Sequence, residues 1–443
     1  APTATDLVQG ELAVNVADKR LYTEDNAGAI VELGTNPSSL TVSGNIDVDG
    51  TTNLDVVDID GAVDMASTLQ VDGAITGSST INGVGINVIE TGSILVSNDG
   101  GTGTISSAVR NTGLGFEVFD DLTSGDDNTG IGRKALTKLT TGGGNTATGS
   151  GSLTAHTTGD SNTAFGVSAL ASNTTASNNT AVGSSALLSN TTASNNTAVG
   201  YSAGSSVTTG VQNTLIGGLA GDALTTGVQN VAVGYNALST EDGHGANVAV
   251  GMNALSTQNA GADAYNTAVG HAAGAAVTTG DSNTLIGGLA GDALTEGTDN
   301  VVVGKSSLSA DTLGSRSVAL GKNTLSAQNF TSATNTYNTA VGHDAGKAVT
   351  TGVQNTLIGA LAGDALTDAD NNVAIGYHSL NADTLGSKSV AVGPYALYSQ
   401  NFTSATNSFN TAVGADAGLL VTTGTNNTLI GALAGDAITT GHS

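Results

Sequence analysis

Asn196-Thr197-Ala198-Val199-Gly200 is one copy of a pentad that recurs, with close variants, nineteen times between Asn111 and the end of the sequence. Fifteen of the eighteen intervals between its closing glycines are 17 residues long. A period this regular indicates a solenoid, in which each repeat forms one coil and stacks on the next. The closing glycines are Gly115, Gly132, Gly149, Gly166, Gly183, Gly200, Gly217, Gly234, Gly251, Gly270, Gly287, Gly304, Gly321, Gly342, Gly359, Gly376, Gly393, Gly414 and Gly431.

Three intervals are longer and end at Gly270, Gly342 and Gly414, after 19, 21 and 21 residues. All three fall at the same phase of a larger block of four coils. A Val-Thr-Thr-Gly motif marks this block and recurs at intervals of 70, 72 and 72 residues. Because extra residues in a solenoid emerge as loops on one face, loops are predicted within residues 258–265, 328–337 and 400–409.

The predicted loops hold a large share of the few aromatic residues of the solenoid. Aromatic side chains on loops are favoured contact residues, so we predict a row of receptor contacts there. The alternative is that the rings fold back to cover the longer coils. The candidate receptor-contact residues are Tyr265, Phe330, Tyr337, Phe402 and Phe409.

Each position of the pentad has an expected structural role. The fourth position is apolar in eighteen of nineteen copies, Thr148 being the exception, so we expect it to point into the core. Glycine closes every copy, which suits a bend where a side chain would clash or φ must be positive. Asn opens seventeen copies, with Ser317 and Ser389 in the other two, and a ladder of side-chain amides is expected. The segment that follows, as in Ala169-Leu170, is predicted to form a second strand.

The composition allows only a thin core. Aromatic residues make up 3% of the 443 residues and Trp and Cys are absent, so small residues must pack the interior without disulfides. A single roll of 17-residue coils would leave apolar flanks exposed, and three rolls packed about an axis would bury them. We therefore expect an all-β fold, a parallel β-roll or β-solenoid, that associates with itself as a homotrimer.

Net charge and hydropathy argue against two classes of partner. The formal charge of −26 repels nucleic acid and anionic lipid headgroups. No apolar run reaches the ~18 to 20 residues that a membrane helix needs, so no membrane insertion is expected.

Two shorter segments precede the solenoid, which we place at residues 106–443. Residues 1–36 contain three short apolar runs separated by turn signals, which is typical of a small antiparallel β-meander. Residues 37–105 alternate apolar and polar residues between glycines, as half-buried strands do. These strands are too short to bury their apolar faces alone, so we predict a β-rich fibrous shaft formed with partner chains.

The predicted shaft is rich in aspartate, and clustered carboxylate oxygens are the ligands that Ca²⁺ prefers. This is the one place where a cofactor, Ca²⁺, is considered. Because the aspartates alternate with apolar residues, the other interpretation places most of them on the solvated face of the strands. They are Asp47, Asp49, Asp55, Asp58, Asp60 and Asp64.

Catalysis is not expected, and no catalytic, cofactor-binding or metal-binding residue is assigned in the solenoid. Glycoside cleavage needs two carboxylates about 5 to 9.5 Å apart. The aspartates that repeat in Leu-Ala-Gly-Asp-Ala, such as Asp222 and Asp292, lie four coils apart, about 19 Å at ~4.8 Å per coil. They are expected to be solvated turn residues. An ice-binding surface is not expected either, because the Val-Thr-Thr-Gly motif returns only at every fourth coil.

The pentads resemble the repeats of a known family. Asn179-Thr180-Ala181-Val182-Gly183, the stretch Asn196 to Gly204, and Ser317-Val318-Ala319-Leu320-Gly321 are similar to the head repeat of trimeric autotransporter adhesins. The heads of that family are trimers of left-handed parallel β-rolls, and the resemblance implies the same arrangement here. The chain differs from that family's pattern in its 17-residue coil and in showing neither a heptad stalk nor a C-terminal membrane anchor.

The first residues resemble a second family. Ala1-Pro2-Thr3-Ala4 and the stretches Gly10 to Asn15, Lys19 to Tyr22 and Val31 to Gly34 are similar to a short module of tail fibres and other virion proteins of bacteriophages. A fibre attached through its virion would also account for the missing membrane anchor.

Together the resemblances imply a structural virion protein, a phage tail fibre that forms a rigid trimeric rod for attachment to the host surface. It would contact other virion tail proteins through its N-terminal region and a host receptor, a glycan or an outer-membrane protein, along the rod. The alternative is a bacterial cell-surface adhesin or extracellular filament protein.

Overall fold

The computed structural model describes residues 7–15, 17, 20–34, 79–81, 84–89, 93–97 and 107–441, together with Thr3. The chain divides into two compact units, residues 1–74 and 75–443. The described residues form an all-β fold and contain no helix. The aspartates considered for Ca²⁺, between Asp47 and Asp64, lie outside the described residues.

The first unit contains the antiparallel meander that the sequence predicts. Its strands β1 (Leu12–Asn15), β2 (Arg20–Glu24) and β3 (Ile30–Gly34) pair in chain order. The turn between β2 and β3 is closed by Asp25, whose Oδ1 accepts the N–H groups of Ala27 and Ala29, each at 2.9 Å. Gly28 completes this turn with a φ of +81°.

The second unit opens with three antiparallel strands, β4 (Ser79–Ile81), β5 (Val84–Ile89) and β6 (Ser93–Ser97). Strand β6 pairs in parallel with β7 (Thr112–Leu114), the first strand of the solenoid, so that Ile94 lies opposite Thr112. The solenoid sheet therefore begins inside the range that the sequence assigned to the shaft.

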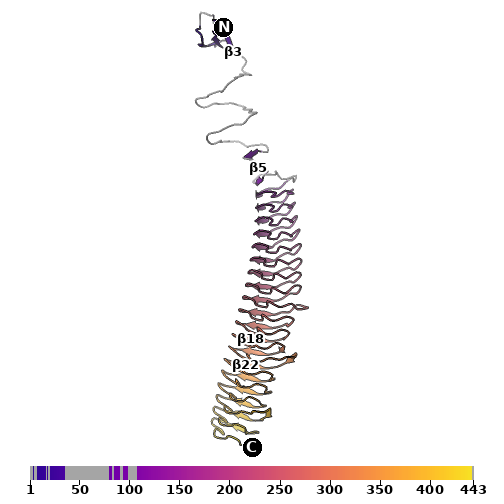
Figure 1. Ribbon diagram of the computed structural model, residues 1–443, viewed down its shortest axis with the longest axis vertical. Coiled ribbons are helices and arrows are strands. Elements are labelled where there is room, and N and C mark those ends of the chain that lie inside the picture. Colours follow the sequence, from indigo (N-terminus) through magenta and orange to yellow (C-terminus); the bar gives the residue numbers. More distant parts are fainter. Residues whose placement is uncertain are drawn as a thin grey trace. The chain divides into compact units, whose positions relative to one another are not determined.

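The solenoid consists of stacked coils, each of which contributes one three-residue strand to a long parallel sheet (Figure 1). We number the coils 1 to 19 by their closing glycines, from Gly115 to Gly431. The sheet strands are β7 (Thr112–Leu114), β8 (Thr129–Ile131), β9 (Thr146–Thr148), β10 (Thr163–Phe165), β11 (Thr180–Val182), β12 (Thr197–Val199), β13 (Thr214–Ile216), β14 (Val231–Val233), β15 (Val248–Val250), β16 (Thr267–Val269), β17 (Thr284–Ile286), β18 (Val301–Val303), β20 (Val318–Leu320), β22 (Thr339–Val341), β23 (Thr356–Ile358), β24 (Val373–Ile375), β26 (Val390–Val392), β28 (Thr411–Val413) and β29 (Thr428–Ile430).

All these strands pair in register, so each pentad position forms a column along the solenoid. Between β11 and β12, for example, Thr180 lies opposite Thr197, and Ala181 opposite Ala198. The predicted parallel β-solenoid of 17-residue coils is thereby confirmed.

The inward position of the strand is the third residue of the pentad, and the prediction that the fourth points inward was wrong. Ala198 is fully buried, whereas Val199 is only partly covered and its equivalents Leu114 and Ile430 are exposed. A three-residue strand can direct only its middle side chain to the core, because successive side chains alternate between the two faces.

Each closing glycine permits a close contact between coils. Gly287 has a φ of +133°, and a Cβ placed on it would lie 2.6 Å from the carbonyl oxygen of Gly304 in the next coil. The same clash with the next closing glycine recurs from Gly115 to Gly414. Glycine is therefore needed both for its φ and for the tight stacking of the coils.

The segment after the glycine is a turn, so the predicted second strand was wrong. In coil 4 the residues Ser168 and Leu170 have φ values of +57° and +52°, which strands do not adopt. The segment still bonds to its neighbours, since the N–H of Leu170 donates to the carbonyl of Ala186 at 3.0 Å. Hydrogen bonding between coils therefore continues around this side without a second sheet.

The predicted ladder of amides is confirmed. The Oδ1 of Asn196 accepts the backbone N–H of Asn213 at 2.9 Å, while its Nδ2 donates to the carbonyl of Gly210 at 2.8 Å. Equivalent bonds link most successive pentad asparagines, all of which are buried. The ladder satisfies buried backbone groups inside the coil, where they would otherwise lack partners.

The thin core is filled by complementary sizes. Eight of the nineteen coils have Ala in the strand and Leu four residues after the glycine, and each Leu-Ala-Gly-Asp-Ala coil reverses this pattern. Leu215 points inward from β13, and a Cβ on Gly204 or Gly221 would lie 2.6 or 2.7 Å from its methyl carbons. The methyl groups of Leu215 thus occupy the space left by the glycine of the same coil and by that of the coil before.

Candidate functional site

The outer face of the parallel sheet is a continuous surface of two columns. The second pentad position is Thr or Val in every coil, and the fourth is apolar in all but one. Side chains of both columns lie on the outside of the strands, and several of the fourth column are exposed, including Ile216, Ile286 and Ile358. β-Branched residues suit such a surface because they pack on a pleated sheet. An apolar strip of this length is unusual for a protein surface that faces only water.

The loops of the irregular coils place the five predicted contact residues in two different environments. Tyr265, Tyr337 and Phe409 are 64%, 50% and 51% exposed. Phe330 and Phe402 are only 6% exposed, so their rings fold back onto the longer coils. A Cβ on Gly386 in coil 16 would lie 2.7 Å from the Phe402 ring of coil 17. The prediction of exposed rings is therefore corrected for Phe330 and Phe402, because the longer coil leaves space that an aromatic ring fills.

A buried carboxylate holds each of the two longer loops. The Oδ1 of Asp311 accepts the N–H of Gly314 at 3.0 Å and the N–H of Phe330 at 3.2 Å. In the next block Asp383 does the same for Gly386 and Phe402, at 3.0 and 3.1 Å. Two-residue strands fasten these loops further, β19 (Gly314–Ser315) to β21 (Thr334–Asn335) and β25 (Gly386–Ser387) to β27 (Thr406–Asn407).

Where serine replaces asparagine in the ladder, a glutamine side chain supplies the missing amide. The Nε2 of Gln328 donates to Ser317 Oγ at 2.9 Å and to Asp311 Oδ2 at 2.6 Å, while its Oε1 accepts from Asn338 at 2.9 Å. Gln400 bridges Ser389, Asp383 and Asn410 in the same way. Each longer loop is thus built on a fully bonded buried network.

The three exposed aromatic residues occupy one column, the position before the pentad asparagine. In two blocks a cation from the preceding coil covers the ring. Arg316 lies 5.8 Å from the centre of the Tyr337 ring and donates to its hydroxyl at 2.9 Å, and Lys388 lies 5.3 Å from the Phe409 ring. Such contacts stabilise each ring and occupy part of its surface.

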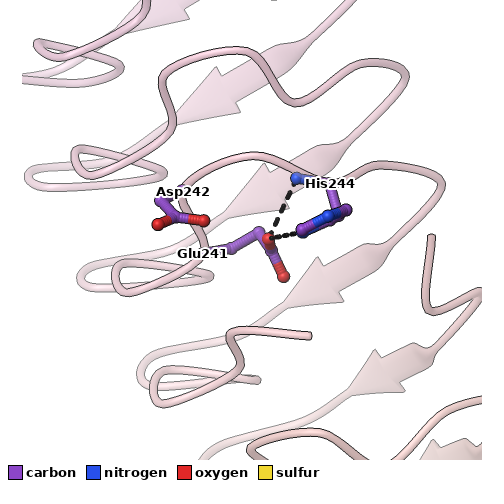
Figure 2. A group of neighbouring side chains, drawn as sticks. All are labelled: Glu241, Asp242 and His244. Carbon is purple, nitrogen blue, oxygen red and sulfur yellow. Dashed lines mark hydrogen bonds and ion pairs between the residues drawn. The ribbon is translucent and has the colours of Figure 1, made fainter. Parts of the chain in front are cut away.

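Coil 8 contains a group of three side chains with metal-ligand chemistry, Glu241, Asp242 and His244. One ligand atom of each lies within 4.8 Å of the others. Figure 2 shows the Glu241 carboxylate directed toward His244, whose Nδ1 lies 3.4 Å from Oε1, with Asp242 on the other side. Carboxylate and imidazole together suit a divalent cation such as Zn²⁺.

The role of Glu241 is better explained by its column. It occupies the position of Asp311 and Asp383, seven residues after the closing glycine, and it is likewise fully buried. Its Oε1 accepts the N–H of His244 at 3.1 Å and its Oε2 accepts the N–H of Ala260 at 3.4 Å. Both oxygens therefore already bond to the backbone of this block's loops, and we assign Glu241 the same loop-holding role.

The repeated aspartates are less solvated than the sequence predicted. Asp222, Asp292 and Asp364 are half-buried, and burial raises the pKa of all three carboxyls above the ordinary value.

Among the histidines, His156 is fully buried at the corner of coil 3, and burial lowers its pKa. It fits the ladder as a neutral side chain that contacts Asn173 and the carbonyl of Gly159.

Threonine columns are more continuous than the Val-Thr-Thr-Gly motif suggests. Threonine pairs equivalent to Thr208-Thr209 occupy every coil from 2 to 7. The first threonine of each pair is half-buried, and its Oγ1 donates to a carbonyl of the next coil, as Thr174 does to Thr191 at 3.0 Å. This column therefore contributes to the bonds between coils.

The described residues contain a cavity of about 10 Å³ at the start of the solenoid, lined by Leu95, Ala108, Phe119 and Leu122 among others. It has room for about one water molecule.

None of the described residues forms a helix long and apolar enough to cross a membrane. Comparison with known proteins finds no matching family model, curated protein or solved structure.

The two-column outer face was not predicted from the sequence, because the fourth pentad position was assigned to the core. One signal was available: the second position is β-branched in all nineteen coils, although Thr is polar. A position that accepts Thr and Val equally belongs on a pleated outer surface. With the second and fourth positions facing outward, the third must face inward.

Proposed function

We propose that this chain is the rod-forming part of a fibrous virion appendage, a phage tail fibre, in which three copies associate to attach the particle to a host surface. The observation that carries the proposal is the two-column outer face. Its apolar column continues through the coils of a chain whose net charge is −26, so self-association would bury it where water now contacts it. Three chains side by side would also multiply weak contacts with a receptor.

The resemblance of the first residues to virion proteins of bacteriophages supports attachment through the N-terminal region. The meander β1 to β3 is compact enough to act as a joint with other tail proteins. Receptor contacts would be made along the solenoid, where the exposed Tyr265, Tyr337 and Phe409 recur once in each block.

Chain association is tested by placing charges on the outer face. In the variant Ile216→Glu, Ile286→Glu, Ile358→Glu, three carboxylates enter the apolar column at equivalent positions. Since these side chains point outward, each coil should fold normally by circular dichroism, while repulsion and desolvation separate the chains. Light scattering coupled to gel filtration should show a trimer for the parent and a monomer for the variant.

A matched control carries the same charges in another column. Thr209→Glu, Thr279→Glu and Thr423→Glu alter exposed positions where coil 11 already has Glu296, and this variant should stay trimeric. A monomeric parent chain, or a triple-isoleucine variant that remains trimeric, would refute association through this face.

Immunogold electron microscopy with an antibody against the solenoid should label virions. Label confined to cell surfaces would refute the virion fibre and support the adhesin.

A further inference from the structure

Coils 16 and 17 carry a cluster of rings that no other coil has among the described residues. We call Tyr377, His378, Tyr395 and Tyr398 the aromatic patch. The ring centres of Tyr377 and Tyr395 lie 5.5 Å apart, and those of Tyr395 and Tyr398 lie 5.6 Å apart. His378 stacks on Tyr395 at 5.6 Å with an angle of 11° between the planes. The tyrosine pairs meet edge to face, at 85° and 65°, so the rings form one connected aromatic cluster.

Three of the four rings are not needed to form these coils, because the equivalent coils of the two preceding blocks do without them; only Tyr377 has an aromatic equivalent, Tyr235. His378 corresponds to Asn236 and Ser306, Tyr395 to Asn253 and Asn323, and Tyr398 to Ser256 and Ser326. Small polar residues thus suffice at all three positions. Tyr377 and Tyr395 also remain 48% and 36% exposed in the cluster. In this block alone, rings replace small polar residues at three neighbouring positions. This indicates a contact surface rather than a packing requirement.

Hydrogen-bonding groups border the rings. Asp364 lies one coil before the patch and accepts a hydrogen bond from Asn381, which sits in the same coil as His378. Asp416 lies one coil after the patch, within electrostatic range of Tyr395. The Nδ1 of His378 is buried and has no hydrogen-bond partner among the described residues. The patch and its border span four coils, about 14 Å at ~4.8 Å per coil.

This combination fits a neutral sugar chain. The face of an aromatic ring is electron-rich and attracts the weakly positive C–H groups of a pyranose ring, while carboxylates and amides accept and donate hydrogen bonds to its hydroxyls. An acidic glycan is disfavoured because Asp364 and Asp416 flank the rings, and the nearby Lys347 is already paired with Asp344 at 3.6 Å. The net charge of −26 acts in the same direction.

We propose that the aromatic patch binds an uncharged polysaccharide of the host surface, with Tyr377, Tyr395 and Tyr398 stacking against its sugar rings. The inference rests on the proposed function, since it names the receptor class and one receptor site of the fibre. The patch lies on two coils of one chain, so binding does not require a second copy. The aromatic patch is a second candidate site, separate from the exposed loop aromatics Tyr265, Tyr337 and Phe409.

The test replaces the rings with the residues of the other blocks. Tyr395→Asn with Tyr398→Ser restores the side chains of Asn323 and Ser326 and should therefore fold. The control is Tyr201→Ser, which removes an exposed tyrosine of coil 6. Binding is screened on an array of neutral, acidic and amino oligosaccharides and then measured by titration of tyrosine fluorescence, which no tryptophan obscures.

The parent and the Tyr201→Ser control should bind at least one neutral oligosaccharide with equal affinity, and the double variant should bind it at least about tenfold more weakly. Binding only to acidic or cationic probes, no binding at all, or equal binding by the double variant would overturn the proposal. Chain association and immunogold labelling report separately on the fibre. A trimeric fibre on virions with no glycan binding refutes the patch alone, whereas a monomer that binds glycan refutes the fibre alone.

Discussion

At the scale of single residues, the fold depends on two pentad positions that serve different needs. The closing glycine allows each coil to approach the next more closely than any side chain would permit. The opening asparagine supplies one acceptor and two donors to buried groups: the Oδ1 of Asn145 accepts from Asn162, and its Nδ2 donates to Gly159 and Asn128. Neither residue contributes apolar burial, so the repeat is held in register by sterics and hydrogen bonds.

Two adjacent glycines offer a direct test of this steric requirement. Gly287→Ala should destabilise the protein by about 2 kcal/mol or more, because φ is +133° and the new methyl group would meet the carbonyl of Gly304. Gly288→Ala should change little, since a Cβ there meets nothing within 4 Å. Thermal unfolding followed by circular dichroism measures both. Equal midpoints for the two variants would contradict the argument.

At the scale of elements, the two 21-residue irregular coils are held by specific contacts of their own. Their extra residues form short parallel pairs, bury a phenylalanine and bond to a carboxylate in the preceding coil. The acid and the following glutamine recur as Asp311 with Gln328 and as Asp383 with Gln400. A buried network of this kind is stable only when every group is paired, so its members depend on one another.

Removing one carboxylate should release one loop. Asp383→Ala leaves the N–H groups of Gly386 and Phe402 and the amide of Gln400 without their acceptor, at a cost of about 2 kcal/mol or more. Hydrogen exchange should rise at least about tenfold in residues 401–409. The equivalent loop at 329–337, held by Asp311, serves as the internal control, and Asp368→Ala removes an exposed carboxylate for comparison. Unchanged exchange in residues 401–409 would show that the loop does not depend on Asp383.

At the scale of the solenoid, stability is distributed among neighbouring coils. Each strand pairs only with the strand before and the strand after it, and each coil places its side chains against the same two neighbours. Such a structure behaves as a sum of repeats and interfaces, and no single coil is indispensable. What must be preserved is the register of the columns.

Deletion of a whole coil should therefore be tolerated. Removing residues 179–195 joins Asn178 to Asn196 and keeps every column aligned, so the melting temperature should fall by less than about 4 °C. Removing residues 179–187 deletes about half a coil, shifts the asparagine ladder and should abolish cooperative unfolding of the coils around it. Calorimetry of the two deletions checks this expectation, which fails if they behave alike.

Much of the fold was predictable because the repeat is long and regular. The period, the coil length, the amide ladder and the glycine bends all follow from side chains that act locally. The inward position of the strand was not predicted correctly. An apolar side chain such as that of Val199 can pack either in a core or on an outer face, so its type does not tell the two apart. Of the five predicted contact residues, Phe330 and Phe402 are buried, since local sequence does not show how much space a longer coil leaves inside.

The period of the solenoid and the residues that set its register follow from the amino-acid sequence alone, because glycine φ values and asparagine hydrogen bonds act between residues one coil apart. The folded solenoid is needed to show which columns face outward, which loop aromatics remain exposed, and that Tyr377, Tyr395 and Tyr398 lie together. These outcomes depend on the direction of side chains after the coils have stacked. Residues 17 or more positions apart become neighbours only in the closed solenoid.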